Sequence, residues 1–253
     1  MATAILDAVT PITEDITYAG GVEAYLVRPA EASPRSCAGI LFWHWLDTQA
    51  PDGNRSQFRS EAERLAARGA LALLPQGRFP WTIAPSGSEA DRGEVEAEVA
   101  RVRAGLDLLA ARPEVDPERL AVVGHDYGAM HAIVEAAGDP RVNALVVIAA
   151  TPRWSDWNVP FWGLAEGQLA YDTAMHDLDP IERMKDLAGR PILLQFGERD
   201  FYIAMMSAFG FRAAAGETAE LKRYDAEHDM RVPEAVADRD AFLTRVLGLR
   251  PPG

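Results

Sequence analysis

The chain has 253 residues, 48% hydrophobic and 25% charged, which is long enough for one α/β domain that buries its own core. Its 25 Lys and Arg against 38 Asp and Glu give a formal net charge of −13, which disfavours nucleic acid and anionic membranes as partners. The single cysteine, Cys37, excludes an internal disulfide and a thiolate metal cluster. The N-terminus lacks a basic start followed by an apolar core, and no apolar run approaches the roughly 20 residues that span a bilayer. We therefore expect a soluble cytoplasmic protein.

The first part of the chain alternates between strand and helix patterns. Alternating or nearly continuous apolar residues predict strands over 22–30, 37–45 and 70–77, and the Gly pair in "YAGGVEAY" predicts a hairpin turn before the first of them. Helical periodicity covers 56–69 and 88–112. Strand therefore follows helix repeatedly before the middle of the chain.

The same alternation continues to the C-terminus. Strands are predicted over 119–125, 143–150, 191–197 and 219–226, and helices over 127–137, 203–215 and 233–248. Strands and helices at this spacing imply an α/β fold, with a mostly parallel sheet covered by helices on both faces, in a single domain spanning 1–253. In such folds the chemistry lies beyond the carboxyl ends of the strands.

An irregular stretch over 152–186 interrupts this alternation. It holds three of the six tryptophans, Trp154, Trp157 and Trp162. The segment could lie over the strand ends as a small lid and supply aromatic walls to a pocket. The alternative is a surface excursion that its aromatic residues pin to the domain.

The stretch "RLAVVGHDYGAMHAIVEAAG", residues 119–138, predicts a sharp strand-to-helix turn at Asp126. Gly124 and Gly128 flank Asp126 two residues to either side, where larger side chains would collide with the neighbouring strand or helix. The turn also puts the carboxylate at a helix N-terminus, where backbone amides favour negative charge. The alternative is an ordinary turn in which Asp126 caps the helix.

Two further candidates follow Asp126 in the order acid, then histidine. Asp200 ends the strand in "PILLQFGERD", and His228 follows the next strand in "LKRYDAEHDM". Both are expected beyond strand ends on the same edge of the sheet as Asp126. The alternatives are a capping Asp200 and a solvated His228.

The motifs "FWHW", "GHDYGA", "FGERD" and "EHDM" make the chain resemble the α/β-hydrolase superfamily over nearly its whole length, and dienelactone-hydrolase-like proteins most of all. Those relatives normally carry cysteine or serine at the turn. The Gly-His-Asp-aromatic-Gly form instead resembles the turn of epoxide hydrolases and, less closely, of dehalogenases. That resemblance implies that Asp126 is a nucleophile, His228 a base, and Asp200 the residue that orients it.

A carboxylate nucleophile changes the reaction that such a site favours. Attack on an ester would give a mixed anhydride, whereas attack on saturated carbon gives an ordinary alkyl ester of the enzyme, which His228 and water could cleave. We therefore predict a hydrolase that acts on an epoxide or a carbon–halogen bond. The alternatives are dienelactone-hydrolase-like cleavage of an ester or lactone, with Asp126 as a base, and an inactive homologue that only binds a ligand.

The remaining predicted site residues belong to an oxyanion hole or to the substrate pocket. Backbone N–H groups of Tyr127 and of Trp45 or Leu46 are the expected oxyanion donors. The expected pocket residues are His44, Trp154, Trp157, Tyr171, Tyr202 and Arg153. Tyr171 is the preferred acid for an epoxide oxygen, and the Trp45 indole is expected to wall the pocket rather than bind a leaving group. We expect no metal and no cofactor, because the histidines lack metal-ligand spacing, and we expect only a small-molecule substrate and water as partners.

Overall fold

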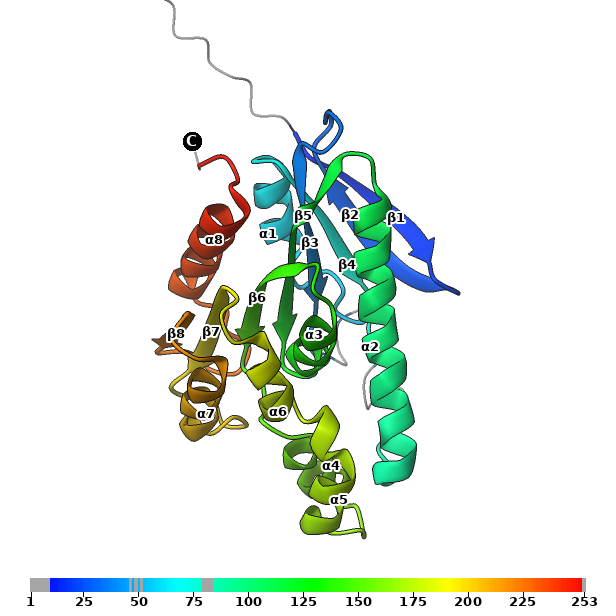
Figure 1. Cartoon of the computed structure of the whole chain (residues 1–253), viewed down its shortest axis with the longest axis vertical. Coiled ribbons are helices and arrows are strands. Elements are labelled where there is room, and N and C mark those ends of the chain that lie inside the picture. Colours follow the sequence, from blue (N-terminus) through cyan, green and yellow to red (C-terminus); the bar gives the residue numbers. More distant parts are fainter. Residues whose placement is uncertain (1–9, 46, 48–49, 51, 79–83, 252–253) are drawn as a thin grey trace, which may run out of the picture.

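The computed structural model describes residues 10–45, 47, 50, 52–78 and 84–251. Eight strands form one sheet in the order β1-β2-β4-β3-β5-β6-β7-β8 (Figure 1). β1–β2 and β2–β4 pair antiparallel, and all the other neighbours pair parallel. The strands are β1 (Ile12–Tyr18), β2 (Val22–Arg28), β3 (Cys37–Trp43), β4 (Ala70–Pro75), β5 (Val115–His125), β6 (Val142–Ile148), β7 (Ile192–Gly197) and β8 (Ala219–Tyr224). The mostly parallel α/β fold predicted from the sequence is confirmed.

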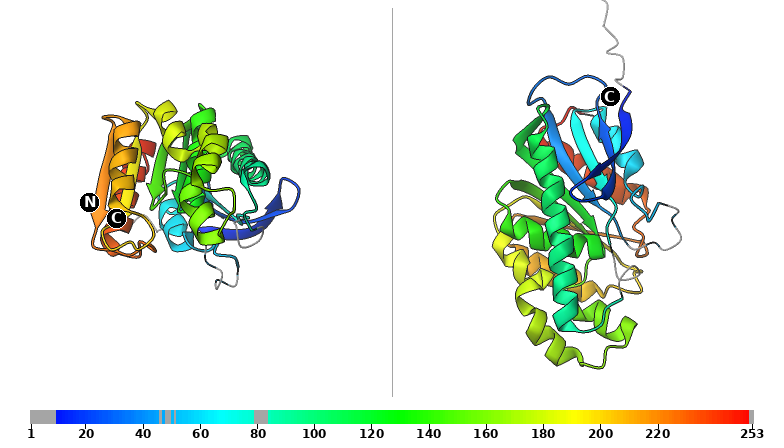
Figure 2. Two further views of the ribbon diagram at one scale, coloured as in Figure 1. Left: turned by 90° about the horizontal axis from the view of Figure 1, so that it is seen from below. Right: turned by 90° about the vertical axis from the view of Figure 1, so that its right-hand side faces the viewer.

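Helices cover both faces of the sheet (Figure 2). One face carries α1 (Arg59–Ala66) and α8 (Pro233–Leu247), which contact each other. The other carries α2 (Ser88–Ala111), α3 (Tyr127–Gly138), α6 (Pro180–Met184) and α7 (Met205–Ala215). Burial from both sides explains why β3 and β4 are apolar at nearly every position. None of the helices in the described ranges is long and apolar enough to cross a membrane.

β1 is the one strand that the sequence patterns do not predict. It pairs with β2 through a turn after Tyr18, where Gly20 and Gly21 take positive φ angles of 77° and 109°. The predicted hairpin turn is therefore present. β1 forms the sheet edge, and six of its seven residues are exposed or only partly buried, which leaves little hydrophobic pattern to detect.

The segment over 152–186 is not an irregular stretch, as the sequence suggested, but contains several short helices. They are α4 (Ser155–Trp162), α5 (Gln168–Met175), η1 (His176–Leu178) and α6, and η2 (Lys185–Leu187) follows. α6 packs on α3 and α7, whereas α4 and α5 lie at the lower end of the molecule in Figure 1, beside the start of α2. Helices this short, one with Pro160 inside it, give too few turns for periodicity to reveal.

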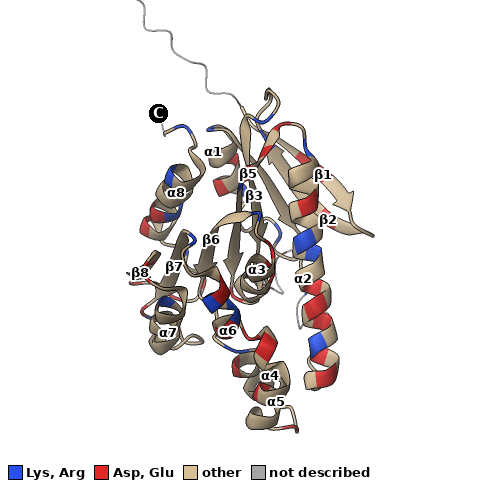
Figure 3. Ribbon diagram, viewed as in Figure 1, with Lys and Arg blue, Asp and Glu red and all other residues tan. Residues whose placement is uncertain are grey.

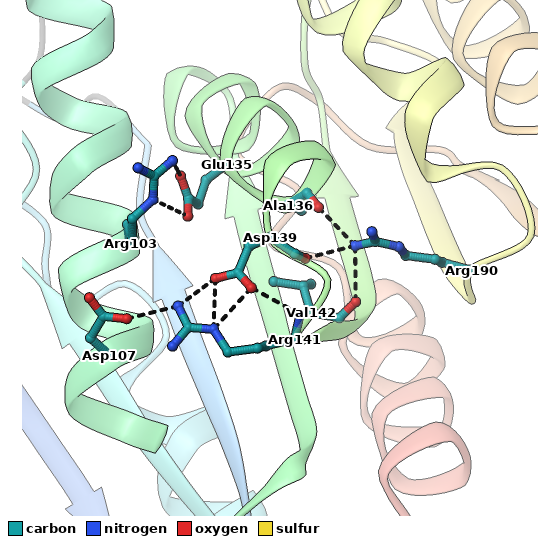
Figure 4. A network of polar contacts seen from close by, with 8 residues as sticks. All are labelled: Arg103, Asp107, Glu135, Ala136, Asp139, Arg141, Val142 and Arg190. Atoms are coloured by element: carbon teal, nitrogen blue, oxygen red, sulfur yellow. Dashed lines mark hydrogen bonds and ion pairs between the residues drawn. The ribbon is translucent and has the colours of Figure 1, made fainter. Parts of the chain in front are cut away.

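The C-terminal end of α3 is held by a polar network (Figure 4). Arg103 of α2 donates two hydrogen bonds of 2.9 Å to Glu135, and Arg141 binds both Asp139 and Asp107. The Arg190 guanidinium donates to the carbonyls of Ala136, Asp139 and Val142 at 2.8 to 3.2 Å. The Arg190 bonds to Ala136 and Asp139 satisfy carbonyls that a helix end leaves free. They anchor the helix whose first residue follows Asp126.

Candidate active site

Asp126 lies at a sharp turn between β5 and α3. Its φ of 55° and ψ of −125° are unfavourable for a residue with a side chain, and such strain concentrates at functional positions. Its N–H donates to Ile148 O at 2.9 Å, and its carbonyl accepts from the N–H groups of Ala129 and Met130. The backbone is therefore held on both sides of the strained residue.

The two flanking glycines are required by close backbone contacts. A Cβ on Gly124 would lie 2.4 Å from Ala129 Cα, and one on Gly128 would lie 2.3 Å from His44 O. Real Cβ atoms do not approach so closely, so the turn cannot form with larger residues without moving its neighbours. The steric reason inferred from the sequence is thus present in the structure.

The structure brings Asp126, His228 and Asp200 together at the carboxyl ends of the parallel strands. His228 Nδ1 donates to Asp200 Oδ2 at 2.8 Å, and His228 Nε2 lies 3.8 Å from Asp126 Oδ1. The shorter contact is a hydrogen bond, whereas the longer one is an ion-pair distance. Asp200 Oδ1 accepts from the N–H groups of Tyr202 and Ile203, which fixes its carboxylate.

All three side chains are almost completely buried, with exposed fractions of 3%, 8% and 1% for Asp126, His228 and Asp200. Burial by itself disfavours a charged imidazole, but the carboxylates of Asp126 and Asp200 outweigh it and raise the pKa of His228 to about 9. His228 is therefore protonated near neutral pH. Asp126 Oδ1 accepts no hydrogen bond from any residue that the structure describes. A buried oxygen without a donor faces the protonated ring.

A chain of hydrogen bonds runs from the Trp45 N–H through the side chains of Gln57 and His125 to the backbone carbonyl of His228. The Trp45 N–H donates to Gln57 Oε1 at 2.9 Å, and Gln57 Nε2 lies 2.6 Å from His125 Nδ1. His125 Nε2 donates to the backbone carbonyl of His228 at 2.9 Å, because a carbonyl can only accept. Burial holds the pKa of His125 well below its usual value, so its ring is neutral and each nitrogen has one role. His125 therefore has a structural role behind His228.

This chain affects the predicted oxyanion hole. Because the Trp45 N–H already donates to Gln57, it is not free to bind an oxyanion in this structure. Leu46, the other donor expected from this turn, lies outside the described residues. The role of the Tyr127 N–H, directly after Asp126, as a donor to an oxyanion stays a prediction.

His44 is held as a structural residue rather than exposed to a substrate. Its Nε2 accepts from the Gly77 N–H at 2.9 Å, and its Nδ1 lies 3.0 Å from Trp45 O. Burial lowers the pKa of His44 to about 4, so the ring is neutral. With both nitrogens used, His44 joins the ends of β3 and β4, which corrects its predicted place in the pocket.

Tyr171 is also held inside the protein. Its hydroxyl donates to Asp91 Oδ2 and accepts from Asn158 Nδ2, both at 2.8 Å, and Asn158 Oδ1 in turn accepts from the Tyr127 hydroxyl. The ring is fully buried. Since its proton already has an acceptor, Tyr171 does not supply the acid predicted for a leaving oxygen. Sequence patterns gave no signal for Asn158 or Asp91.

The other predicted pocket residues divide into two groups. Trp157 and Tyr202 have rings 6.0 and 5.2 Å from the His228 ring, so both lie at the site. Trp154 lies beside Tyr127 and donates its indole N–H to Leu178 O, and it lines a cavity of about 40 Å³ together with Asn158. Arg153 lines a separate open groove with Asp172, Thr173 and His176.

No cluster of three or more His, Cys, Asp and Glu side chains in the described part of the chain could hold a metal ion. Asp126 offers an unpartnered oxygen, and His228 offers a proton on Nε2.

A family model and several solved structures resemble this chain. Residues 22–241 match the model of the dienelactone hydrolase family. An esterase of Thermogutta terrifontis, solved with propionate bound, has a TM-score of 0.72 and 18% identity over 100% of both chains. An acetyl xylan esterase from Paenibacillus sp. R4 has a TM-score of 0.72 and 16% identity, covering 97% of this chain and 86% of that one.

A protein from Klebsiella pneumoniae, assigned as a dienelactone hydrolase, has a TM-score of 0.66 and 22% identity, covering 94% of this chain and 98% of that one. At such identities these structures show the shared fold. No curated protein sequence shows significant similarity to the chain.

Proposed function

Because the chain belongs to the dienelactone hydrolase family, we propose that it hydrolyses an ester or a lactone at the site formed by Asp126, His228 and Asp200. The observation that carries the proposal is the buried Asp126 oxygen that accepts no hydrogen bond from the described residues and lies 3.8 Å from a histidine that Asp200 orients. This function was the alternative reading of the sequence, and the family match favours it over an epoxide or halide substrate.

The charges at the site suit direct attack by water, without a covalent enzyme intermediate. Asp126 takes a proton from a water molecule, whose oxygen attacks the carbonyl carbon of the substrate. The tetrahedral intermediate then expels the alcohol, which takes its proton from Nε2 of His228. Asp126 returns its proton to His228, so that an ester and one water give an acid and an alcohol. A serine nucleophile would need a neutral histidine, whereas this route uses the protonated His228 that two carboxylates favour.

The carboxylate also favours a second candidate, attack of Asp126 on saturated carbon bearing an epoxide oxygen or a halide. The carbon–oxygen bond of the epoxide or the carbon–halogen bond breaks as the alkyl ester forms. His228 gives its Nε2 proton to the epoxide oxygen, whereas a halide leaves as the ion and His228 loses its proton to water, because the uncharged ester lowers its pKa. A neutral His228 could then take a proton from water attacking the Asp126 carbonyl carbon. Tyr127 N–H is the proposed donor to the oxyanion in this route.

Oxygen-18 water separates the two routes in single-turnover reactions. Water attack on an ester puts the label into the acid product and leaves Asp126 unlabelled, whereas the alkyl-ester route puts the label into Asp126. His228→Gln provides a second measurement, because it would accumulate a covalent adduct of Asp126 with epoxides or haloacids, detected by intact mass spectrometry. No turnover of esters, lactones, epoxides or haloacids, and no adduct, would overturn both routes and favour a binding protein.

A further inference from the structure

A row of aromatic rings leads from His228 to the surface. The Tyr202 and Trp157 rings lie 5.2 and 6.0 Å from the His228 ring. Phe161 lies 4.7 Å from Trp157, and Phe201 lies 5.4 Å from Tyr202. Phe161 and Tyr202 are 6.0 Å apart, so the two branches also touch each other. We call Trp157, Phe161, Phe201 and Tyr202 the aromatic entrance.

The two outer rings, Phe161 and Phe201, are more exposed than the two rings that lie next to His228. Trp157 is 8% exposed, Tyr202 49%, Phe161 53% and Phe201 89%. Phe201 directly follows Asp200, the residue that orients His228. Large aromatic side chains rarely remain in water as a connected group unless they bind something.

The segments that bear the aromatic entrance carry no cation. Residues 154–175 and 200–209 contain no Lys or Arg but include Asp156, Glu166, Asp172 and Asp200 (Figure 3). Arg153 and Arg199 directly precede these segments, and Arg199 is paired with Asp225. The acids in these segments and the total charge of −13 both repel an anionic substrate, and the charge of His228 is already balanced by Asp126 and Asp200. The Trp157 indole N–H is buried and has no acceptor among the described residues, so one hydrogen-bond donor is available in this apolar wall.

We propose that the aromatic entrance binds the flat, apolar part of an uncharged substrate while its reacting carbon lies at Asp126. The inference rests on the proposed function for the reaction, but the binding itself does not require turnover. The substrate class is a neutral ester or lactone with an aryl or arylalkyl group. Aromatic rings stack on such groups and exclude water from them.

The first test compares kcat/KM for benzyl acetate, ethyl acetate and the acetate ester of 4-(hydroxymethyl)benzoate. We expect the wild type to prefer benzyl acetate over ethyl acetate by about tenfold, the value of roughly 1.4 kcal/mol of aromatic contact. It should also prefer benzyl acetate over the benzoate ester, because the carboxylate of that ester is repelled by the acidic protein. Phe161→Ala and Phe201→Ala should each reduce the preference for benzyl over ethyl acetate several-fold. The control Leu169→Ala removes a side chain that is 82% exposed and outside the aromatic entrance, and should leave the preference unchanged.

The second test measures binding of benzyl alcohol to Asp126→Asn by calorimetry, with and without Phe161→Ala. Binding that Phe161→Ala weakens several-fold supports the inference, even if the wild type hydrolyses no ester and the proposed function fails. The inference would be overturned if the protein hydrolysed esters without preferring benzyl acetate and if Phe161→Ala left the affinity for benzyl alcohol unchanged. The proposed function would then remain intact. A dimer that Phe201→Ser dissociates, with no change in benzyl preference, would also overturn it, because a second copy would then cover these rings.

Discussion

Asp126→Asn removes the negative charge that lies 3.8 Å from His228 Nε2, while leaving the shape of the side chain almost unchanged. An opposite charge at this distance typically shifts a pKa by about 1 to 3 units, or about 1 to 4 kcal/mol at 1.36 kcal/mol per unit. The pKa of His228 should therefore fall from about 9 by that amount. Asp200 still holds Nδ1 at 2.8 Å, so it should keep part of the upward shift.

Nitrogen-15 NMR of the histidine rings against pH measures this shift directly. Burial lowers the pKa of His44 to about 4 and that of His131 to about 3, so neither titrates in the alkaline range. Asp107→Asn is the matched control, because Asp107 binds Arg141 on the outside of α2. A pKa of His228 in Asp126→Asn within half a unit of the wild-type value would refute the electrostatic reasoning.

The same coupling predicts how stability depends on pH. A folded-state pKa of about 9 against an ordinary value of 6.5 means that the His228 contribution is full below pH 6.5. It is lost as pH rises from 6.5 through 9, by about 3 kcal/mol in total. Urea unfolding at a series of pH values should show a smaller alkaline loss in Asp126→Asn, and an equal loss in both proteins would contradict the coupling.

Three further substitutions test the support of the site and of the fold. Gln57→Leu removes the hydrogen bonds that the Gln57 side chain makes with the Trp45 N–H and with His125. The free energy of unfolding in urea should fall by about 1 to 3 kcal/mol, and a change below about half a kcal/mol would count against this chain of bonds. Gly128→Ala puts a Cβ 2.3 Å from the His44 carbonyl oxygen, so it should destabilise the folded protein by about 2 kcal/mol or more and abolish activity. The control is Gly93→Ala on α2, where a Cβ would meet no atom within 4 Å; it should leave stability unchanged or raise it by up to about 1 kcal/mol. Arg239→Met leaves Glu61 charged and buried, so thermal unfolding should show a loss of about 3 to 5 kcal/mol, which adding Glu61→Met should largely restore.

The central strands and the long helices could be predicted because the spacing of apolar residues in each segment reflects which of its faces are buried. β3 is apolar at every position and α2 repeats its apolar residues at helical spacing, so each segment carries its signal locally. β1 and the short helices α4 and α5 could not be predicted in this way. An exposed edge strand and helices of eight residues give too short or too weak a pattern.

Some residues of the candidate site could likewise be predicted from local patterns, and others could not. Asp126, Asp200 and His228 could be proposed because each follows a predicted strand, and the ends of parallel strands share one edge of a sheet. The partners of Trp45 and Tyr171 could not, because Gln57 and Asp91 come from distant segments whose side chains have no fixed spacing from them.

The order of the central strands and long helices, and the tight turn at Asp126, were determined by the sequence alone, because residue patterns and backbone geometry are local properties. Which groups are free to react was decided only by the tertiary structure. Folding occupies the Trp45 N–H and the Tyr171 hydroxyl, leaves the Asp126 oxygen without a donor among the described residues, and places two carboxylates around one buried imidazole. Hydrogen bonds and charge coupling depend on distances between side chains far apart in the chain, and those distances exist only after folding.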